Sequence, residues 1–121
     1  MKHTPGFLAI VEDAKSRIGE ITTSEYAVLR DAGTPHVLID VREESEWMAS
    51  HAAGAIHIGK GIIERDIETR VPGTEDLIVL YCGGGFRSAL AADAIQKMGY
   101  KNVRSLAGGW QAWKEAALPV V

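Results

Sequence analysis

One cysteine of the chain stands among residues that could support nucleophilic chemistry. Cys82 is the only cysteine among 121 residues, and Gly83, Gly84 and Gly85 follow it directly. A glycine held in one conformation costs roughly 0.5–1 kcal/mol relative to alanine, so an ordinary turn would rarely use three in a row. We therefore predict a loop that turns its backbone N–H groups inward around the sulfur.

The residues after the glycines extend this candidate site. A sulfur nucleophile reacts as the thiolate, but a free thiol with an unperturbed pKa of about 8.5 is only roughly 3% ionised at neutral pH. Inward N–H groups, a following helix N-terminus and the charge of Arg87 would favour the thiolate, and they would also hold an incoming anion. A lone cysteine is more often an inert buried residue, yet an arginine in a first helical turn opposes the helix dipole and indicates an anion partner. The predicted site is therefore the nucleophile Cys82 with a substrate-binding loop of Gly83, Gly84, Gly85, Phe86, Arg87 and Ser88 that would hold an anion.

The composition is that of a single globular domain and excludes several functions. Hydrophobic residues make up 46% of the chain, which suffices for one core. The net charge is −3 and the basic residues are scattered, so we expect no nucleic-acid partner. No apolar run is long enough to span a membrane, and the N-terminus does not resemble a secretory signal, so we expect a cytoplasmic protein without a membrane partner. The four histidines and one cysteine show no ligand spacing, so no metal and no cofactor are expected.

The elements that must position the loop alternate along the chain. Short apolar runs predict strands at 37–41, 55–58, 77–81 and 103–106. Helical spacing, a capping box at Thr22 and Glu25, and glycine stops predict helices at 5–18, 23–32, 43–48, 62–68, 88–98 and 109–116. Such alternation is typical of an α/β fold with a mainly parallel sheet covered by helices on both faces. Ligands bind beyond the carboxyl ends of these strands, and Cys82 directly follows the strand at 77–81.

Several separated segments resemble one family. The segment Cys82-x-x-Gly85-x-Arg87-Ser88 resembles the active-site loop of single-domain rhodanese-like sulfurtransferases. Further segments, at 38–43, 51–58, 99–103 and 106–113, resemble other signatures of that family, in order along the chain. The resemblance implies a rhodanese-like α/β fold, with a central parallel sheet of about five strands flanked by helices on both faces. It places the rhodanese-like domain at 21–121, with residues 1–20 as an N-terminal helical extension packed on it.

The resemblance also implies a reaction. A sulfurtransferase of this family moves a sulfane sulfur from a donor, such as thiosulfate, polysulfide or a small persulfide, to an acceptor through a persulfide on its cysteine, here Cys82. The acceptor would be cyanide, a thiol or a cysteine of a partner protein. Asp40 and Arg42 are expected to support the loop from beneath, and Lys60 and Arg65 are candidate substrate contacts. Thiosulfate-using members often carry a basic residue where this chain has Gly83, which disfavours thiosulfate as the natural donor.

Two other functions compete with sulfur transfer. Cysteine phosphatases and arsenate reductases of related fold use Cys-x5-Arg, but position 88 of this chain is serine and the arginine comes one residue earlier. The shorter loop suits a sulfur atom better than a phosphate. A non-catalytic rhodanese-like binding or regulatory module is the other alternative, and retention of Cys82 with its glycines argues against it.

Overall fold

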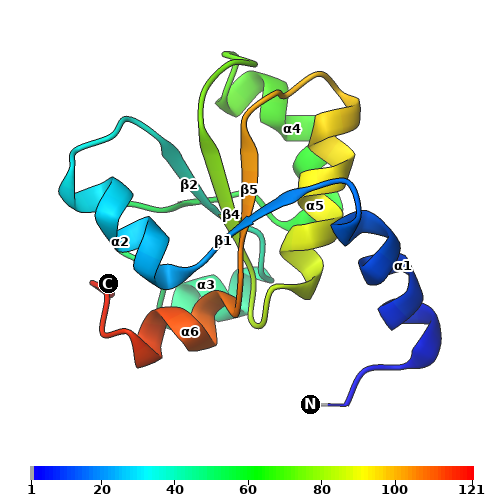
Figure 1. Ribbon diagram of the computed structural model, residues 1–121, viewed down its shortest axis with the longest axis horizontal. Helices are drawn as coiled ribbons and strands as arrows, with labels where there is room; N and C mark the ends of the chain where they lie inside the picture. The colour runs from blue at the N-terminus through cyan, green and yellow to red at the C-terminus, as the bar shows by residue number, and fades with distance from the viewer. Residues whose placement is uncertain (1) are drawn as a thin grey trace.

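A five-stranded parallel sheet forms the centre of the protein in the computed structural model, which describes residues 2–121 (Figure 1). The strands lie in the order β1-β5-β4-β2-β3, and all their pairings are parallel. Their bounds are β1 Gly19–Ile21, β2 Val37–Asp40, β3 Ile56–His57, β4 Ile78–Tyr81 and β5 Val103–Leu106. The predicted α/β class and parallel sheet are confirmed, and β4, which leads into Cys82, is the central strand.

Helices cover both faces of this sheet, as Figure 1 shows. Their bounds are α1 Pro5–Lys15, α2 Thr23–Asp31, α3 Glu44–Ala49, α4 Ile63–Arg70, α5 Phe86–Lys97 and α6 Gly109–Glu115, with a short 3-10 turn at Lys60–Ile62. Helices α4 and α5 cover one face, while α2 and α6 cover the other. The predicted capping box is present, with Thr22 Oγ1 accepting from the Glu25 N–H and the Glu25 carboxylate accepting from the Thr22 N–H.

The central strand divides its side chains between two cores. Ile78 and Leu80 point into the core under α4 and α5, whereas Val79 and Tyr81 point into the core under α2 and α6. All four are fully buried, as expected for a parallel strand covered on both faces. The period of two along a strand therefore puts Cys82 on the α4 and α5 side of the sheet.

The structure departs from the sequence predictions by one additional strand and by shifted boundaries of several elements. Strand β1 was not predicted, because its three residues include a glycine and a glutamate and carry no apolar run. Helix α1 ends at Lys15 rather than Ile18. Helix α5 begins at Phe86 rather than Ser88, because Gly85 already adopts the left-handed conformation of its N-cap, with φ of +96°. The last difference brings the first helical turn closer to the sulfur.

Helix α1 packs on α5. Val11 and Ala14 bury their side chains there. The Arg17 guanidinium just beyond α1 donates to both carboxylate oxygens of Asp93 on α5, at 2.9 and 2.8 Å. The extension is thus fixed to the helix that begins at the candidate loop. Within residues 2–121, no helix is long and apolar enough to cross a membrane.

Candidate active site

The sulfur of Cys82 lies within the turn of the glycine loop. The Gly85 N–H donates to Cys82 Sγ at 3.1 Å, and the Cys82 thiol donates to Ser88 Oγ at 3.5 Å. The cysteine residue is only 1% exposed. An N–H group at this distance can donate to a negative charge on the sulfur or on an atom bound to it. The loop therefore provides at least one of the inward N–H groups that the sequence predicts.

Two glycines allow the loop to pack against helix α6. At Gly85 a side chain would be strained by the positive φ and would lie 3.3 Å from the backbone nitrogen of Gly108. At Gly109 a Cβ atom would collide with the carbonyl oxygen of Cys82. This close approach lets the N–H groups of Trp110 and Gln111 donate to the carbonyls of Cys82 and Gly83, at 2.7 and 3.2 Å. The first turn of α6 thus fixes the backbone of Cys82 and Gly83.

A pair of buried serines extends from the sulfur into the sheet. Ser88 Oγ lies 2.8 Å from the Oγ of Ser105 on β5, and both residues are fully buried. When Cys82 is a thiolate, the Ser88 hydroxyl can reverse and donate to it while it accepts from Ser105. The two serines can therefore form hydrogen bonds with the sulfur as a thiol or as a thiolate, and only hydroxyl hydrogens need to move.

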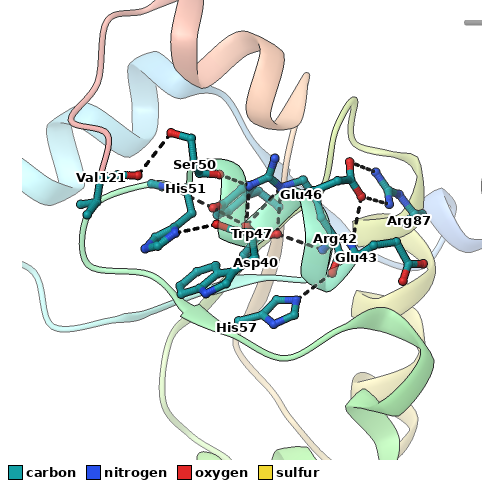
Figure 2. Close-up of polar contacts among 12 residues, drawn as sticks. Asp40, Arg42, Glu43, Glu46, Trp47, Ser50, His51, His57, Arg87 and Val121 are labelled. Atoms are coloured by element: carbon teal, nitrogen blue, oxygen red, sulfur yellow. Dashed lines mark hydrogen bonds and ion pairs between the residues drawn. The ribbon is translucent and has the colours of Figure 1, made fainter.

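Arg87 has a different partner from the anion that the sequence suggested. Figure 2 shows its guanidinium facing Glu46 of helix α3, with bonds of 2.8 and 3.3 Å to the two carboxylate oxygens. Glu46 lowers the charge available to a ligand, and its hydrogen bond raises the pKa of Arg87. The same bond from Arg87 lowers the pKa of Glu46. Both groups are about one-third exposed, so water screens the pair in part.

Asp40 and Arg42 form a buried ion pair beneath the loop. The Arg42 Nη2 donates to Asp40 Oδ2 at 2.8 Å, and the Tyr81 hydroxyl donates to the same oxygen at 2.7 Å. Tyr81 in turn accepts from the Ala52 N–H, and burial raises the pKa of its hydroxyl. Burial alone would lower the pKa of Arg42, but the hydrogen bonds that Arg42 donates to Asp40 and the nearby negative charge together outweigh burial, and the net direction is upward. Such contacts are typical of a pair that stabilises the fold, and the structural role of Asp40 and Arg42 stays a prediction.

Arg42 also connects three other segments (Figure 2). Its Nη2 donates to the Ser50 carbonyl at 2.7 Å, and its guanidinium lies 4.6 Å from the centroid of the Trp110 ring on α6. His57 Nε2 lies 2.8 Å from the Arg42 carbonyl, which can only accept, so that nitrogen carries the proton. Arg42 therefore ties the ends of β2 and β3 to the helix that caps the loop.

Two adjoining hollows of about 390 and 400 Å³ open over the loop. They share a lining from the N-terminal segment, helix α3 and the loop: His3, Glu46, Gly84, Phe86 and Arg87. Phe7 closes one hollow, while Gly83 and Gln111 line the other. A larger hollow, about 560 Å³, lies instead by the amino ends of β2 and β4, and its lining contains no cysteine. The two hollows over the loop are therefore the candidate substrate site, although Cys82 itself lines neither of them.

The two candidate cations after β3 lie apart from these hollows. Lys60 lines a separate hollow with Arg42, Glu43 and His57. Arg65 is largely exposed and pairs with the neighbouring Asp66. Their contact with substrate stays a prediction. Among residues 2–121, no cluster of three or more metal-ligating side chains is found.

Sequence reasoning missed several residues that the fold brings to the site. Glu46 and Ser105 come from other elements, and His3 and Phe7 come from the extension, to which only a packing role was given. Ser105 carried a weak signal, since a serine in an apolar strand indicates a buried polar contact. The others carried none, because the partner of each lies far along the chain.

Comparison with known proteins agrees with this geometry. The family model described as rhodanese-like domain matches residues 22–116. The chain is 36% identical over 83 residues to the thiosulfate sulfurtransferase PspE of Escherichia coli. This match covers 69% of this chain and 76% of PspE. The chain is also 34% identical to the probable adenylyltransferase/sulfurtransferase MoeZ of Mycobacterium tuberculosis. That match covers 93% of this chain but only 30% of MoeZ.

A solved structure from Rhodopseudomonas palustris, described as a protein of unknown function and possible tyrosine phosphatase, also matches. It superposes with a TM-score of 0.86 at 33% identity, over 100% of this chain and 98% of the other. The family model covers most of the chain, and the loop, the sheet order and the buried pair beneath the loop are consistent with it. The chain belongs to the family of rhodanese-like domains.

Proposed function

We propose that the protein is a sulfurtransferase that carries a sulfane sulfur on Cys82. The single observation that supports this most is the position of the sulfur, 3.1 Å from the Gly85 N–H in a loop whose arginine comes five residues after the cysteine. Such a loop encloses a persulfide, whose outer sulfur extends the side chain by one atom. Gly83, Gly84, Phe86 and Ser88 complete the enclosure.

The reaction has two balanced halves. The Cys82 thiolate attacks the outer sulfur of a donor, the donor's S–S bond breaks and its electron pair leaves with the rest of the donor. The product is a Cys82 persulfide anion. A thiophilic acceptor, such as cyanide, a thiol or a partner protein's cysteine, then attacks the outer sulfur and releases the Cys82 thiolate. Hydrogen bonds from loop N–H groups stabilise the negative charge in both states.

Intact-mass spectrometry tests this proposal. The purified chain is incubated with thiosulfate, inorganic polysulfide or glutathione persulfide, and we expect a gain of one sulfur atom that cyanide removes as thiocyanate. The matched control is Cys82→Ser, which keeps the size of the side chain and should gain no mass. If no donor loads the wild-type chain, the enzyme function is wrong and a non-catalytic binding module takes its place.

A phosphatase is the second candidate, because one similar structure is described as a possible tyrosine phosphatase. The loop argues against it, since Ser88 stands where Cys-x5-Arg enzymes have their arginine and Arg87 is paired with Glu46. We expect no release of nitrophenol from para-nitrophenyl phosphate above the level of Cys82→Ser. Turnover that depends on Cys82 would reverse the choice.

A further inference from the structure

The N-terminal segment supplies one wall of the hollows over the loop. The His3 and Phe7 rings lie 4.4 and 6.3 Å from the Phe86 ring, centroid to centroid, and 5.2 Å from each other. We call these three residues the aromatic wall. Two of its members lie outside residues 22–116, which match the family model. The wall therefore adds to the loop two residues that the family model does not include.

The hollows offer little charge to a doubly charged donor. Their lining holds one permanent cation, Arg87, and Glu46 binds it through both carboxylate oxygens. The Lys15 ammonium lies 5.3 Å from the Phe86 ring centroid and also pairs with Glu20 at 3.8 Å. An anion such as thiosulfate would thus meet an ion pair and aromatic rings where related loops present a free basic side chain.

The space suits an organic group instead. Volumes near 400 Å³ lie within the range of small-molecule sites. A Cβ atom at position 83 would lie 3.1 Å from Arg87 Nη2, so glycine keeps this part of the hollow open. Because Cys82 is almost fully covered, a donor's outer sulfur must reach it past Gly83 and Gly84 while the remainder stays in the hollow.

Resting on the proposed sulfur transfer, we propose that the aromatic wall selects donors that carry their sulfane sulfur on an apolar, preferably aromatic, organic group. The shared chemistry is a monoanion R–X–S⁻, where X is the sulfur of a persulfide or of a thiosulfonate. The Cys82 thiolate bonds to the outer sulfur, the S–S bond of the donor breaks, and R–X leaves with the electron pair as a thiolate or a sulfinate. Ring-to-ring contact with His3, Phe7 and Phe86 would hold R during this step.

The anchoring of α1 makes such a wall effective. Arg17 binds Asp93 on α5 through two bonds, and Gln96 Nε2 of α5 donates to the Arg17 carbonyl at 3.0 Å. Phe7 therefore stands on a helix that is fixed to α5, and Phe86 is the first residue of α5. The wall is held by the same helix that begins at the reactive loop.

A matched pair of donors tests the proposal. Benzenethiosulfonate and methanethiosulfonate have the same charge and the same reacting sulfur and differ only in the organic group. Loading of Cys82 is followed by intact mass, and the ratio of the two rates is divided by the ratio measured with a free thiol, which removes intrinsic reactivity. We expect a corrected preference of about threefold to tenfold for the aromatic donor, the range that aromatic contacts of this kind give.

Phe7→Ala and His3→Ala should each reduce this preference, because each should slow loading by benzenethiosulfonate more than loading by methanethiosulfonate. Leu8→Ala is the matched control, since it removes an exposed apolar side chain from the same helix and does not line the hollows. His3 precedes α1, so its replacement tests the wall even if Phe7→Ala weakens the helix.

The possible outcomes separate the two proposals. A corrected ratio near one in the wild type, or a preference that survives in both variants, would overturn the aromatic wall while leaving sulfur transfer intact. Absence of loading from every donor would instead overturn the sulfurtransferase function itself.

Discussion

The guanidinium of Arg87 is bound by the carboxylate of Glu46 at 2.8 and 3.3 Å, although 41 positions separate the two residues in the chain. The positive charge of Arg87 is therefore compensated by the negative charge of Glu46 before any ligand binds. This pair explains how an arginine can stand in the first turn of α5 against the helix dipole. It also explains why a loop with an arginine can disfavour a dianion.

Glu46→Gln should lower the KM of the protein for thiosulfate. Loss of the carboxylate frees the Arg87 charge, and we expect the KM for thiosulfate to fall by about twofold to fivefold at low salt, the range of a screened surface pair. Steady-state thiocyanate formation at two salt concentrations measures this. Glu44→Gln, an equal charge change on the same helix, is the control and should give no comparable fall. An unchanged KM in Glu46→Gln would show that the pair does not control donor charge.

The serine pair should affect the rate of loading. Ser88→Ala removes the hydroxyl that faces the sulfur, and we expect loading to slow by roughly tenfold or more, as for loss of a hydrogen bond to a charged group. Ser105→Ala leaves that hydroxyl in place but removes its partner, so a smaller loss is expected. Stopped-flow loading of both variants measures the difference. Equal rates in Ser88→Ala and wild type would remove the serines from the chemistry.

The approach of α6 to the loop should be sensitive to one methyl group. In Gly109→Ala the new Cβ meets the Cys82 carbonyl, so loading should fall and stability should drop by more than the roughly 1–2 kcal/mol of a left-handed alanine. Gly33→Ala is the control, because its φ of +71° carries the same backbone cost with open space around it. Denaturant unfolding and loading rates compare the two. Identical losses in both variants would mean that the close approach has no role.

The buried pair beneath the loop should matter for stability rather than for chemistry. Asp40→Ala leaves the Arg42 charge buried without its partner, and we expect a loss of about 3–5 kcal/mol. Tyr81→Phe removes only a hydroxyl and should cost about 1–3 kcal/mol. Urea unfolding measures both. Loading per folded molecule should stay near wild type in Tyr81→Phe, and a large loss of rate there would give this network a catalytic role.

The anchor of α1 should depend on pH in one direction. The hydrogen bond from Arg17 lowers the pKa of Asp93 from its usual value of 3.8. Because the folded pKa is depressed, the stabilisation is present above the unfolded value and is lost as the pH falls through the folded one. Asp93→Asn should therefore unfold more readily than wild type at about pH 7, and the difference should shrink at about pH 3. Thermal unfolding across this range measures it, and a constant difference would contradict the ion pair.

The sequence was sufficient to predict the fold class, the order of most elements and the family. Strands such as 77–81 and helices such as 23–32 can be predicted from local periodicity and helix caps. The loop at Cys82 can be predicted because its residues are contiguous in the chain. Strand β1 escaped prediction because its register against β5, Gly19 beside Arg104, comes from tertiary pairing and not from an apolar run. Local sequence patterns predict only the secondary structure that residues close together in the chain determine.

Only the tertiary structure decided what surrounds the sulfur. The sequence shows that Arg87 is charged, but not that Glu46 neutralises it; it shows an amphipathic first helix, but not that Phe7 reaches Phe86. Ser105 meets Ser88 only because β4 and β5 are adjacent in the sheet. The chemistry that we propose was predicted from one short segment, residues 82–88. The electrostatics and shape of the site depend instead on packing between segments that are distant in the chain.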